Sequence, residues 1–420
     1  MVTYFSLEST FFLLDYLFNL LYFKLKNTTK EKILTEPLQP IKTGRLLSLD
    51  AFRGLTIAAM LLVNNAGDWG HIFPPLAHAE WHGCTATDLI FPFFLFIMGV
   101  AMAYSFAKRI EQGDIKGKLM KQVVRRTIIL YILNCGIMIT VWGAYLGHFR
   151  YVGVLQRIAV CYFISSIIIL NSGIKGQAFW TILFLAVYYF LLKFVPVPGH
   201  GSGVLDKYAN ISDYIDTKIM GTSVYEWDDK LNIGHDPEGL LSMIPAISST
   251  LAGVLCGHWL RRKDKDNFEK VSGMAVVGAL LVIIAALWKY DMPFNKNIWT
   301  PSYVVHTTGW GLLSLAVCYW IIDIKGYRAW SKPFVVYGTN AITAYFGASV
   351  MAYLTVWIRW KDAAGKTVYL KYFIYDHIYK NWVPYLFGDY ISSAMWGTTY
   401  VILWCALMWI LYKKKIFIKI

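Results

Sequence analysis

Long apolar stretches recur along almost the whole of this 420-residue chain. Several are long enough to cross the roughly 30 Å hydrocarbon core of a bilayer as helices. Because lipid offers no hydrogen-bonding partner to exposed backbone, such stretches must be helical rather than open sheet. Charged residues make up only 16% of the chain, against about 25% in ordinary soluble domains. The sequence therefore predicts an all-α polytopic membrane protein.

The apolar windows predict a bundle of ten transmembrane helices. Their ranges are 50–66, 87–107, 126–145, 153–171, 177–195, 240–260, 271–288, 303–323, 334–357 and 392–412. Residues 1–42 form a separate N-terminal segment, in which 10–23 is apolar but short. That stretch is an eleventh span, an interfacial helix, or the product of a misassigned start. Residues 43–420 make up the transmembrane domain, with an external loop over 196–239.

Basic residues are concentrated in every second loop between these spans. They are Lys24, Lys26, Lys30, Lys32, Lys42, Arg45, Lys108, Arg109, Lys116, Lys118, Lys121, Arg125, Arg126, Lys175, Arg261, Arg262, Lys263, Lys265, Lys325, Arg328, Lys332 and Lys413–Lys415. Because Lys and Arg mark the cytoplasmic side, these loops are expected inside. Loop 67–86 has no Lys or Arg and loop 196–239 is acidic, so both are expected outside. The same clustering accounts for the net charge of +14 without nucleic acid as a partner.

Titratable groups are packed just before the second span. His78, Glu80, His82 and Asp88 run without a linker into an apolar stretch. Proton-transfer groups at the mouth of a membrane helix indicate chemistry or transport at the bilayer surface. If the segment is helical, the two histidines share one face. The zinc-protease motif has Glu directly after its first His and needs a third ligand, so no metal is expected here.

Several separated segments together resemble one known family. They are Arg45-Leu-Leu-Ser-Leu-Asp-Ala-Phe-Arg-Gly54, Val63-Asn64, His78-Ala-Glu-Trp-His-Gly-Cys-Thr-Ala-Thr-Asp88, Phe91–Gly99, Val154-Leu-Gln-Arg-Ile-Ala159, Asp236-Pro-Glu-Gly-Leu-Leu-Ser242 and Asn295-Lys-Asn-Ile-Trp-Thr-Pro-Ser302. From about residue 43 to its C-terminus the chain resembles the heparan-α-glucosaminide N-acetyltransferase family and its bacterial relatives. The resemblance implies an enzyme that moves acetyl from cytosolic acetyl-CoA to a glucosamine amine across the membrane. It also implies a homodimer and, for a bacterial member, the inner membrane.

The resemblance identifies His78 as the active-site histidine, Asn64 as its amide partner and Asp88 as the carboxylate above the second span. Transfer to an amine needs a base, donors to the oxyanion, and a positioned acceptor. An imidazole titrates near neutrality, so His78 suits a base, or a nucleophile if an acetyl-histidine forms. Asp88 either caps the helix or orients the imidazole, and the two roles are compatible.

Four arginines are candidates for binding acetyl-CoA, because guanidinium groups suit phosphates. They are Arg53, Arg125, Arg126 and Arg157. The alternatives are an ion pair between Arg53 and Asp50, a topology signal at 125–126, and a polar network inside the bundle at Arg157. Amides, carboxylates and aromatic rings suit an amino sugar. The candidate acceptor residues are Glu80, Trp81, His82, His235, Asp236, Glu238, Asn295 and Asn297.

Two other functions compete with acetyl transfer. A secondary transporter of amino sugars also needs polar groups inside the bundle, but should show paired broken helices related by an internal repeat. No such repeat is visible in the sequence. A purely structural scaffold leaves the titratable cluster at 78–88 unexplained. Consumption of acetyl-CoA only when glucosamine is present would separate the enzyme from both alternatives.

Overall fold

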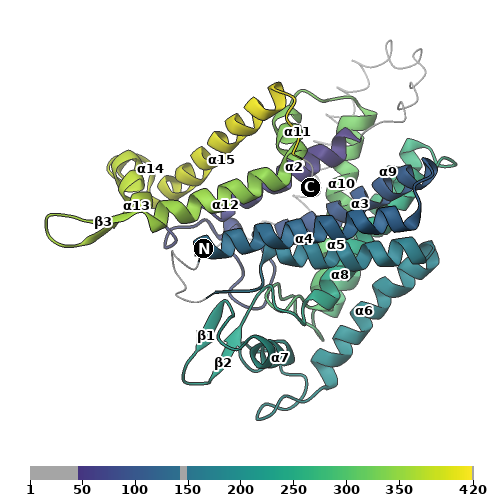
Figure 1. The fold of residues 1–420 in the computed structure, drawn as a ribbon, viewed down its shortest axis with the longest axis horizontal. Helices are drawn as coiled ribbons and strands as arrows, with labels where there is room; N and C mark the ends of the chain where they lie inside the picture. Colours follow the sequence, from purple (N-terminus) through teal and green to yellow (C-terminus); the bar gives the residue numbers. More distant parts are fainter. Residues whose placement is uncertain (1–45, 142–148, 419–420) are drawn as a thin grey trace, which may run out of the picture. The chain divides into compact units, whose positions relative to one another are not determined.

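The computed structural model describes residues 46–141 and 149–418, which are mostly helical (Figure 1). Its longer helices are α2 (Leu47–Val63), α3 (Ile90–Glu111), α4 (Lys116–Val141), α5 (Val154–Asn171), α6 (Ile174–Phe194), α8 (Met243–Arg261), α9 (Asn267–Trp288), α10 (Pro301–Cys318), α12 (Ala341–Trp357) and α15 (Asp389–Lys413). The N-terminal segment 1–42, including 10–23, and the end of the third expected span (142–145) lie outside the described residues.

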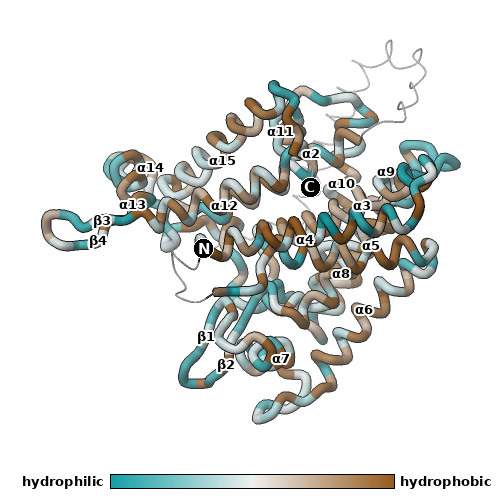
Figure 2. Tube along the Cα trace, viewed as in Figure 1, coloured by the Kyte–Doolittle hydropathy of each residue, from teal (hydrophilic) through white to brown (hydrophobic). Residues whose placement is uncertain are grey.

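Eight helices of the described part of the chain are long and apolar enough to cross a membrane. They are Thr87–Glu111, Lys116–Val141, Val154–Asn171, Ile174–Phe194, Met243–Arg261, Asn267–Trp288, Pro301–Ile324 and Asp389–Lys413. These helices confirm a multi-pass helical membrane protein. Apolar residues dominate their colouring, whereas the hairpin formed by β1 (Glu226–Asp228) and β2 (Ile233–His235) is hydrophilic (Figure 2).

The count of ten or eleven spans stays a prediction. Each of the ten expected spans overlaps a helix, but α2 has only 17 residues and α12 is likewise a shorter helix. The ninth expected span is divided into α11 (Lys332–Thr339) and α12, with Asn340 between them. The Asn340 amide donates to the Ile416 carbonyl (3.0 Å) and accepts from the Ile418 N–H (2.9 Å).

Glycines allow the helices of the bundle to approach closely. A Cβ on Gly338 of α11 would lie 2.0 Å from the Asp50 carbonyl oxygen, and one on Gly54 of α2 would lie 1.7 Å from that of Phe334. α3 and α8 make the same kind of contact through Gly253, where a Cβ would meet the Phe96 carbonyl oxygen at 2.0 Å. Small residues at helix interfaces are typical of membrane proteins, because association there depends on packing. α9 instead exposes apolar side chains suited to lipid, at Val276, Leu280, Ile283 and Leu287.

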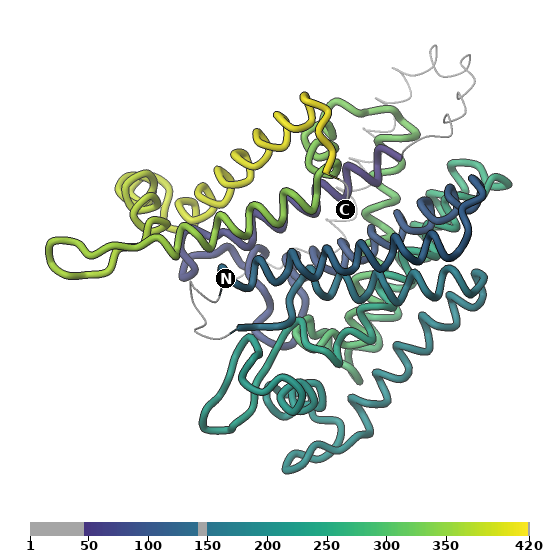
Figure 3. The backbone as a smooth tube through the Cα atoms, viewed as in Figure 1, coloured from purple at the N-terminus to yellow at the C-terminus, as the bar shows by residue number. Residues whose placement is uncertain are grey.

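The loops outside the bundle are more structured than the sequence predicts. Segment 196–239 contains α7 (Ile211–Met220), capped by Asn210, as well as the β1–β2 hairpin. Loop 358–391, whose Tyr-rich sequence predicts one short interfacial helix, contains two, α13 (Leu370–Tyr375) and α14 (Val383–Phe387). It also contains a second hairpin, β3 (Arg359–Lys361) and β4 (Thr367–Tyr369), which extends beyond the end of α12 (Figure 3). The all-α prediction therefore holds for the bundle but misses these three-residue strands.

Candidate active site

His78 and Asp88 form a hydrogen-bonded pair at the entrance to α3. Nδ1 of His78 lies 2.6 Å from Oδ1 of Asp88, which sits in a short 3₁₀ helix, η2 (Thr87–Leu89). Oδ2 of Asp88 accepts hydrogen bonds from the backbone N–H of Ala79 (3.1 Å) and Thr85 (2.9 Å) and from the Thr85 hydroxyl (3.1 Å). The carboxylate is 1% exposed and the His78 side chain 46% exposed. A fixed, buried carboxylate thus orients an accessible imidazole.

Residues 77–86 are not helical, so His78 and His82 do not share a helix face as the conditional prediction supposed. The segment is held by its own contacts. Gly83, at φ 126°, donates its N–H to the Phe294 carbonyl (2.7 Å), and the Trp81 indole donates to the Leu205 carbonyl (2.9 Å). His82 instead faces another loop: its Nδ1 is 3.4 Å from the Asn295 side-chain nitrogen. Burial lowers the pKa of His82.

Lys296 contacts His78 from the loop between α9 and α10. Its Nζ lies 3.2 Å from Nε2 and 3.4 Å from Nδ1 of the imidazole. The loop is shaped by Asn295, whose side-chain oxygen accepts the Ile298 N–H (3.1 Å) and whose own N–H donates to the Thr300 hydroxyl (3.0 Å). Desolvation lowers the pKa of Lys296, against the opposing attraction of nearby carboxylates. From the sequence, Lys296 was expected to line the acceptor site together with Asn295 and Asn297, and its contact with His78 was not predicted.

A buried ionic cluster connects the acidic loop to the start of α5. Arg150 Nε donates to Asp236 Oδ2 (2.8 Å), and its Nη2 contacts Asp236 Oδ1 (2.5 Å) and Glu238 Oε2 (2.6 Å). All three residues are buried. Burial opposes ionisation of Glu238, yet the positive charges of Arg150, Arg157 and Lys296 together lower its pKa. Sequence analysis named Asp236 and Glu238 but missed Arg150, a lone basic residue between two expected spans.

Arg157 lies beside this cluster rather than with the other candidate arginines. Its side chain, on α5, is fully buried, and its guanidinium lies 4.9 Å from the ring centroid of Trp299. Nη2 donates to the Gly239 carbonyl (3.2 Å) and to the Ser242 hydroxyl. Nε and Nη1 have no hydrogen-bond partner within the described chain. Since buried donors are normally paired, these two nitrogens of Arg157 are an exception within the described chain.

The other candidate arginines have separate surroundings on α2 and α4. Arg53 pairs with Asp50 (3.3 Å), as one alternative predicted, and also donates to the Gly338 carbonyl (3.3 Å). Arg125 is exposed on α4, and the half-buried Arg126 guanidinium lies 4.6 Å from the Tyr162 ring centroid.

The remaining candidates differ in how they are held. Asn64 is exposed at the C-terminal end of α2, and no hydrogen bond joins it to His78 among the described residues. Glu80 is exposed and Asn297 half-buried. His235 is buried and pairs through Nδ1 with Asp213 Oδ1 (2.6 Å), and its ring lies edge-on to Trp81 (5.1 Å). Asp213 has no role in the sequence analysis, because it lies 22 positions from its partner.

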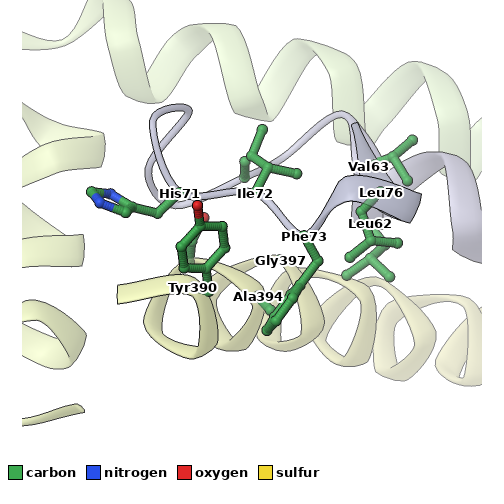
Figure 4. A pocket seen from close by; sticks show the side chains of 11 residues that line it. Leu62, Val63, His71, Ile72, Phe73, Leu76, Tyr390, Ala394 and Gly397 are labelled. Atoms are coloured by element: carbon green, nitrogen blue, oxygen red, sulfur yellow. The ribbon is translucent and has the colours of Figure 1, made fainter. Parts of the chain in front are cut away.

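A mostly apolar pocket lies between the C-terminal end of α2, the loop that follows it and α15 (Figure 4). It is lined by Leu62, Val63, Ala66, His71, Ile72, Phe73, Leu76, Tyr390, Ser393, Ala394 and Gly397. None of these residues is a candidate from the sequence. Leu76 is the last lining residue in the loop after α2 and precedes His78 by two positions. The pocket and His78 therefore share this loop.

Comparison with known proteins identifies the family of the chain. Residues 45–290 match the family model described as heparan-alpha-glucosaminide N-acetyltransferase, catalytic. The mouse and human proteins named heparan-alpha-glucosaminide N-acetyltransferase are each 28% identical over 428 aligned positions, or 90% of this chain. The chain spans 61% of the mouse relative and 60% of the human one. The family match covers more than half of the chain and includes the His78–Asp88 pair and the Arg150 cluster. The chain therefore belongs to the catalytic family of heparan-alpha-glucosaminide N-acetyltransferases.

Proposed function

We propose that this protein is a transmembrane acetyltransferase that moves acetyl from acetyl-CoA to the amine of a glucosamine-type terminal sugar. The observation that carries the proposal is the His78–Asp88 pair, because an accessible imidazole held by a buried carboxylate suits general-base catalysis. The names of the family and of the two relatives support the reaction.

In the direct route, His78 Nε2 takes a proton from the acceptor amine as its nitrogen attacks the acetyl carbonyl carbon. The tetrahedral intermediate collapses, the C–S bond breaks, and the CoA thiolate leaves and receives that proton. Asp88 keeps the imidazole oriented and stabilises the imidazolium. In the covalent route, Nε2 itself attacks and acetyl-histidine forms first. Acetyl recovered on the peptide containing residue 78, after acetyl-CoA is added without acceptor, would distinguish the covalent route.

The acceptor and donor approach from opposite sides in this proposal. The acceptor sugar contacts Glu80, Trp81, His82, His235, Asp236, Glu238, Asn295 and Asn297 on the outer, periplasmic side. The CoA phosphates contact Arg53, Arg125 and Arg126 at the cytosolic side, and the unpaired nitrogens of Arg157 bind nearer the acetyl end of the donor. The basic loops support this orientation, and Asn64 assists His78 by resemblance alone. The proposed setting is a homodimer in a bacterial inner membrane.

Purified protein in detergent tests the activity. We expect it to consume acetyl-CoA only when glucosamine is added, and to release free CoA and N-acetylglucosamine in equal amounts. Movement of the sugar into proteoliposomes without loss of acetyl-CoA would contradict the proposal and favour a transporter. Sidedness is tested separately with His78→Cys in a Cys84→Ser background. An impermeant thiol reagent added outside should label it, and labelling from the cytosolic side alone would reverse the topology.

A further inference from the structure

Lys296 lies over the flat face of the His78 imidazole. Its Nζ is almost equally far from the two ring nitrogens, at 3.2 and 3.4 Å. Those nitrogens are separated by a single ring carbon and their in-plane bonding directions diverge. An amine approaching one of them in the plane would lie much farther from the other. Nζ therefore sits above the ring, and leaves the in-plane position at Nε2 open to a reacting group.

Lys296 has charged neighbours but no structural ion pair. Glu238 and Asp88 attract its ammonium and Arg157 repels it. Within the described ranges, no carboxylate lies at ion-pair distance from Nζ, whereas Glu238 is held by Arg150 and Asp88 by His78 and two backbone N–H groups. The lysine is half-buried beside an exposed imidazole. Its donors are thus available next to the atom at which acetyl transfer takes place.

We propose that Lys296 is a catalytic residue that donates a hydrogen bond to the oxyanion formed on the acetyl carbonyl. The inference rests on the proposed function and adds to it the oxyanion donor. As the nucleophile bonds to the carbonyl carbon, the C=O electron pair moves onto oxygen, beside the ammonium. Collapse restores the carbonyl, breaks the C–S bond and releases the thiolate, which takes the proton held by His78. Lys296 keeps its own proton throughout.

The residue type suits this role. An ammonium is a compact charge with three donors on a flexible stem, so it can follow an oxygen that moves out of the carbonyl plane. A donor aimed at a developing oxyanion favours the transition state over the ground state. The role requires the charged amine. Since desolvation lowers the pKa of Lys296, activity is expected to decline with rising pH earlier than an ordinary lysine would allow.

Three variants test the role: Lys296→Met, Lys296→Arg, and Lys230→Met as a control at an exposed lysine of the β1–β2 turn. Loss of an oxyanion donor lowers kcat by about 10²–10³-fold. We expect that loss in Lys296→Met, with little change in KM for acetyl-CoA or in CoA affinity. Lys296→Arg should recover part of the rate and move the alkaline decline to higher pH. Lys230→Met should match the wild type, and a Lys296→Met enzyme with wild-type kcat would overturn the proposal.

Acylation of His78 by diethyl pyrocarbonate gives a second test that needs neither acetyl-CoA nor sugar. The reagent transfers an ethoxyformyl group to imidazole through a similar oxyanion. Mass spectrometry of the peptides compares His78 with His200, an exposed histidine of the outer loop. We expect Lys296→Met to slow acylation of His78 at least tenfold relative to His200. Equal rates in the wild type and variant overturn the role of Lys296. A slowed rate in a protein that transfers no acetyl supports that role and instead contradicts the proposed function.

Discussion

Oδ1 of the buried Asp88 lies 2.6 Å from Nδ1 of the exposed His78, although ten positions separate the two residues. The carboxylate is fixed by backbone donors on one oxygen and orients the imidazole with the other. Substitutions at these two positions are therefore expected to have different effects. Changes at His78 should affect chemistry far more than folding, and changes at Asp88 should affect both.

His78→Ala should abolish acetyl transfer, with a loss of at least about 10²-fold in rate, because a general base or nucleophile is removed. The side chain is 46% exposed, so the expected loss of unfolding free energy is within about 1 kcal/mol. Steady-state kinetics and a thermal unfolding curve of the same preparation check both expectations. Near-normal turnover in a folded variant would remove His78 from the mechanism and make Glu80 or Asp88 the candidate base.

Asp88→Asn should lower kcat strongly and also destabilise the protein. An amide cannot stabilise the imidazolium as a carboxylate does, and an NH₂ that faces Nδ1 of His78 leaves the proton on Nε2, where the base is needed. If the amide turns the other way, its NH₂ meets the backbone N–H groups of Ala79 and Thr85. A buried donor left without an acceptor costs about 1–3 kcal/mol. The measurement is kcat together with the unfolding midpoint. A variant that lost stability but kept its kcat would restrict Asp88 to a structural role.

His82→Ala should raise KM for the acceptor more than it lowers kcat. Among the described residues His82 contacts Asn295 and the Trp81 ring, and no hydrogen bond joins it to the His78–Asp88 pair. A residue that binds substrate and transition state equally changes KM rather than kcat. Kinetics at varied glucosamine and saturating acetyl-CoA provide the check. A fall in kcat with unchanged KM would instead give His82 a role in the chemistry.

Arg150→Met should strongly destabilise the protein, because it leaves the buried carboxylates of Asp236 and Glu238 without their partner. Breaking a buried ion pair from one side costs about 3–5 kcal/mol. Adding Glu238→Gln to the variant should restore part of the loss, since one of the two unpaired charges is removed. Thermal unfolding of the single and double variants gives the comparison. Equal midpoints for Arg150→Met and the wild type would mean that the cluster contributes no stability.

Asp216 should make the protein less stable as the pH rises toward neutrality. Burial raises the pKa of this carboxyl from 3.8 to about 7. Between those two values the unfolded chain has already released the proton that the folded protein retains, so the free energy of unfolding falls with increasing pH. Asp216→Asn should flatten this dependence, because its side-chain oxygen can still accept the Leu240 and Leu241 N–H groups. Asp229→Asn, at an exposed position, is the matched control. The measurement is the unfolding midpoint of each protein from pH 4 to 8, about the range between the two pKa values.

Local sequence was sufficient for the helices and for the residues at the entrance to α3. Hydropathy identifies a span without any knowledge of its neighbours, and His78 and Asp88 lie in one short motif. Contacts between residues that lie far apart in the sequence could not be predicted from local patterns. Arg150 is 86 positions from Asp236, and Lys296 is 218 positions from His78. The three-residue strands of the two hairpins are too short to show an alternating pattern, and the chain at 77–86 is shaped by contacts with other loops.

The Asn340 amide joins the break between α11 and α12 to backbone atoms of Ile416 and Ile418. The final residues of the described chain therefore complete an element that precedes them by more than seventy positions. During synthesis, that junction has to wait for residues 416–418 before the Asn340 amide has these two partners. The break between α11 and α12 can therefore acquire these hydrogen bonds only after the segment that supplies them has been made.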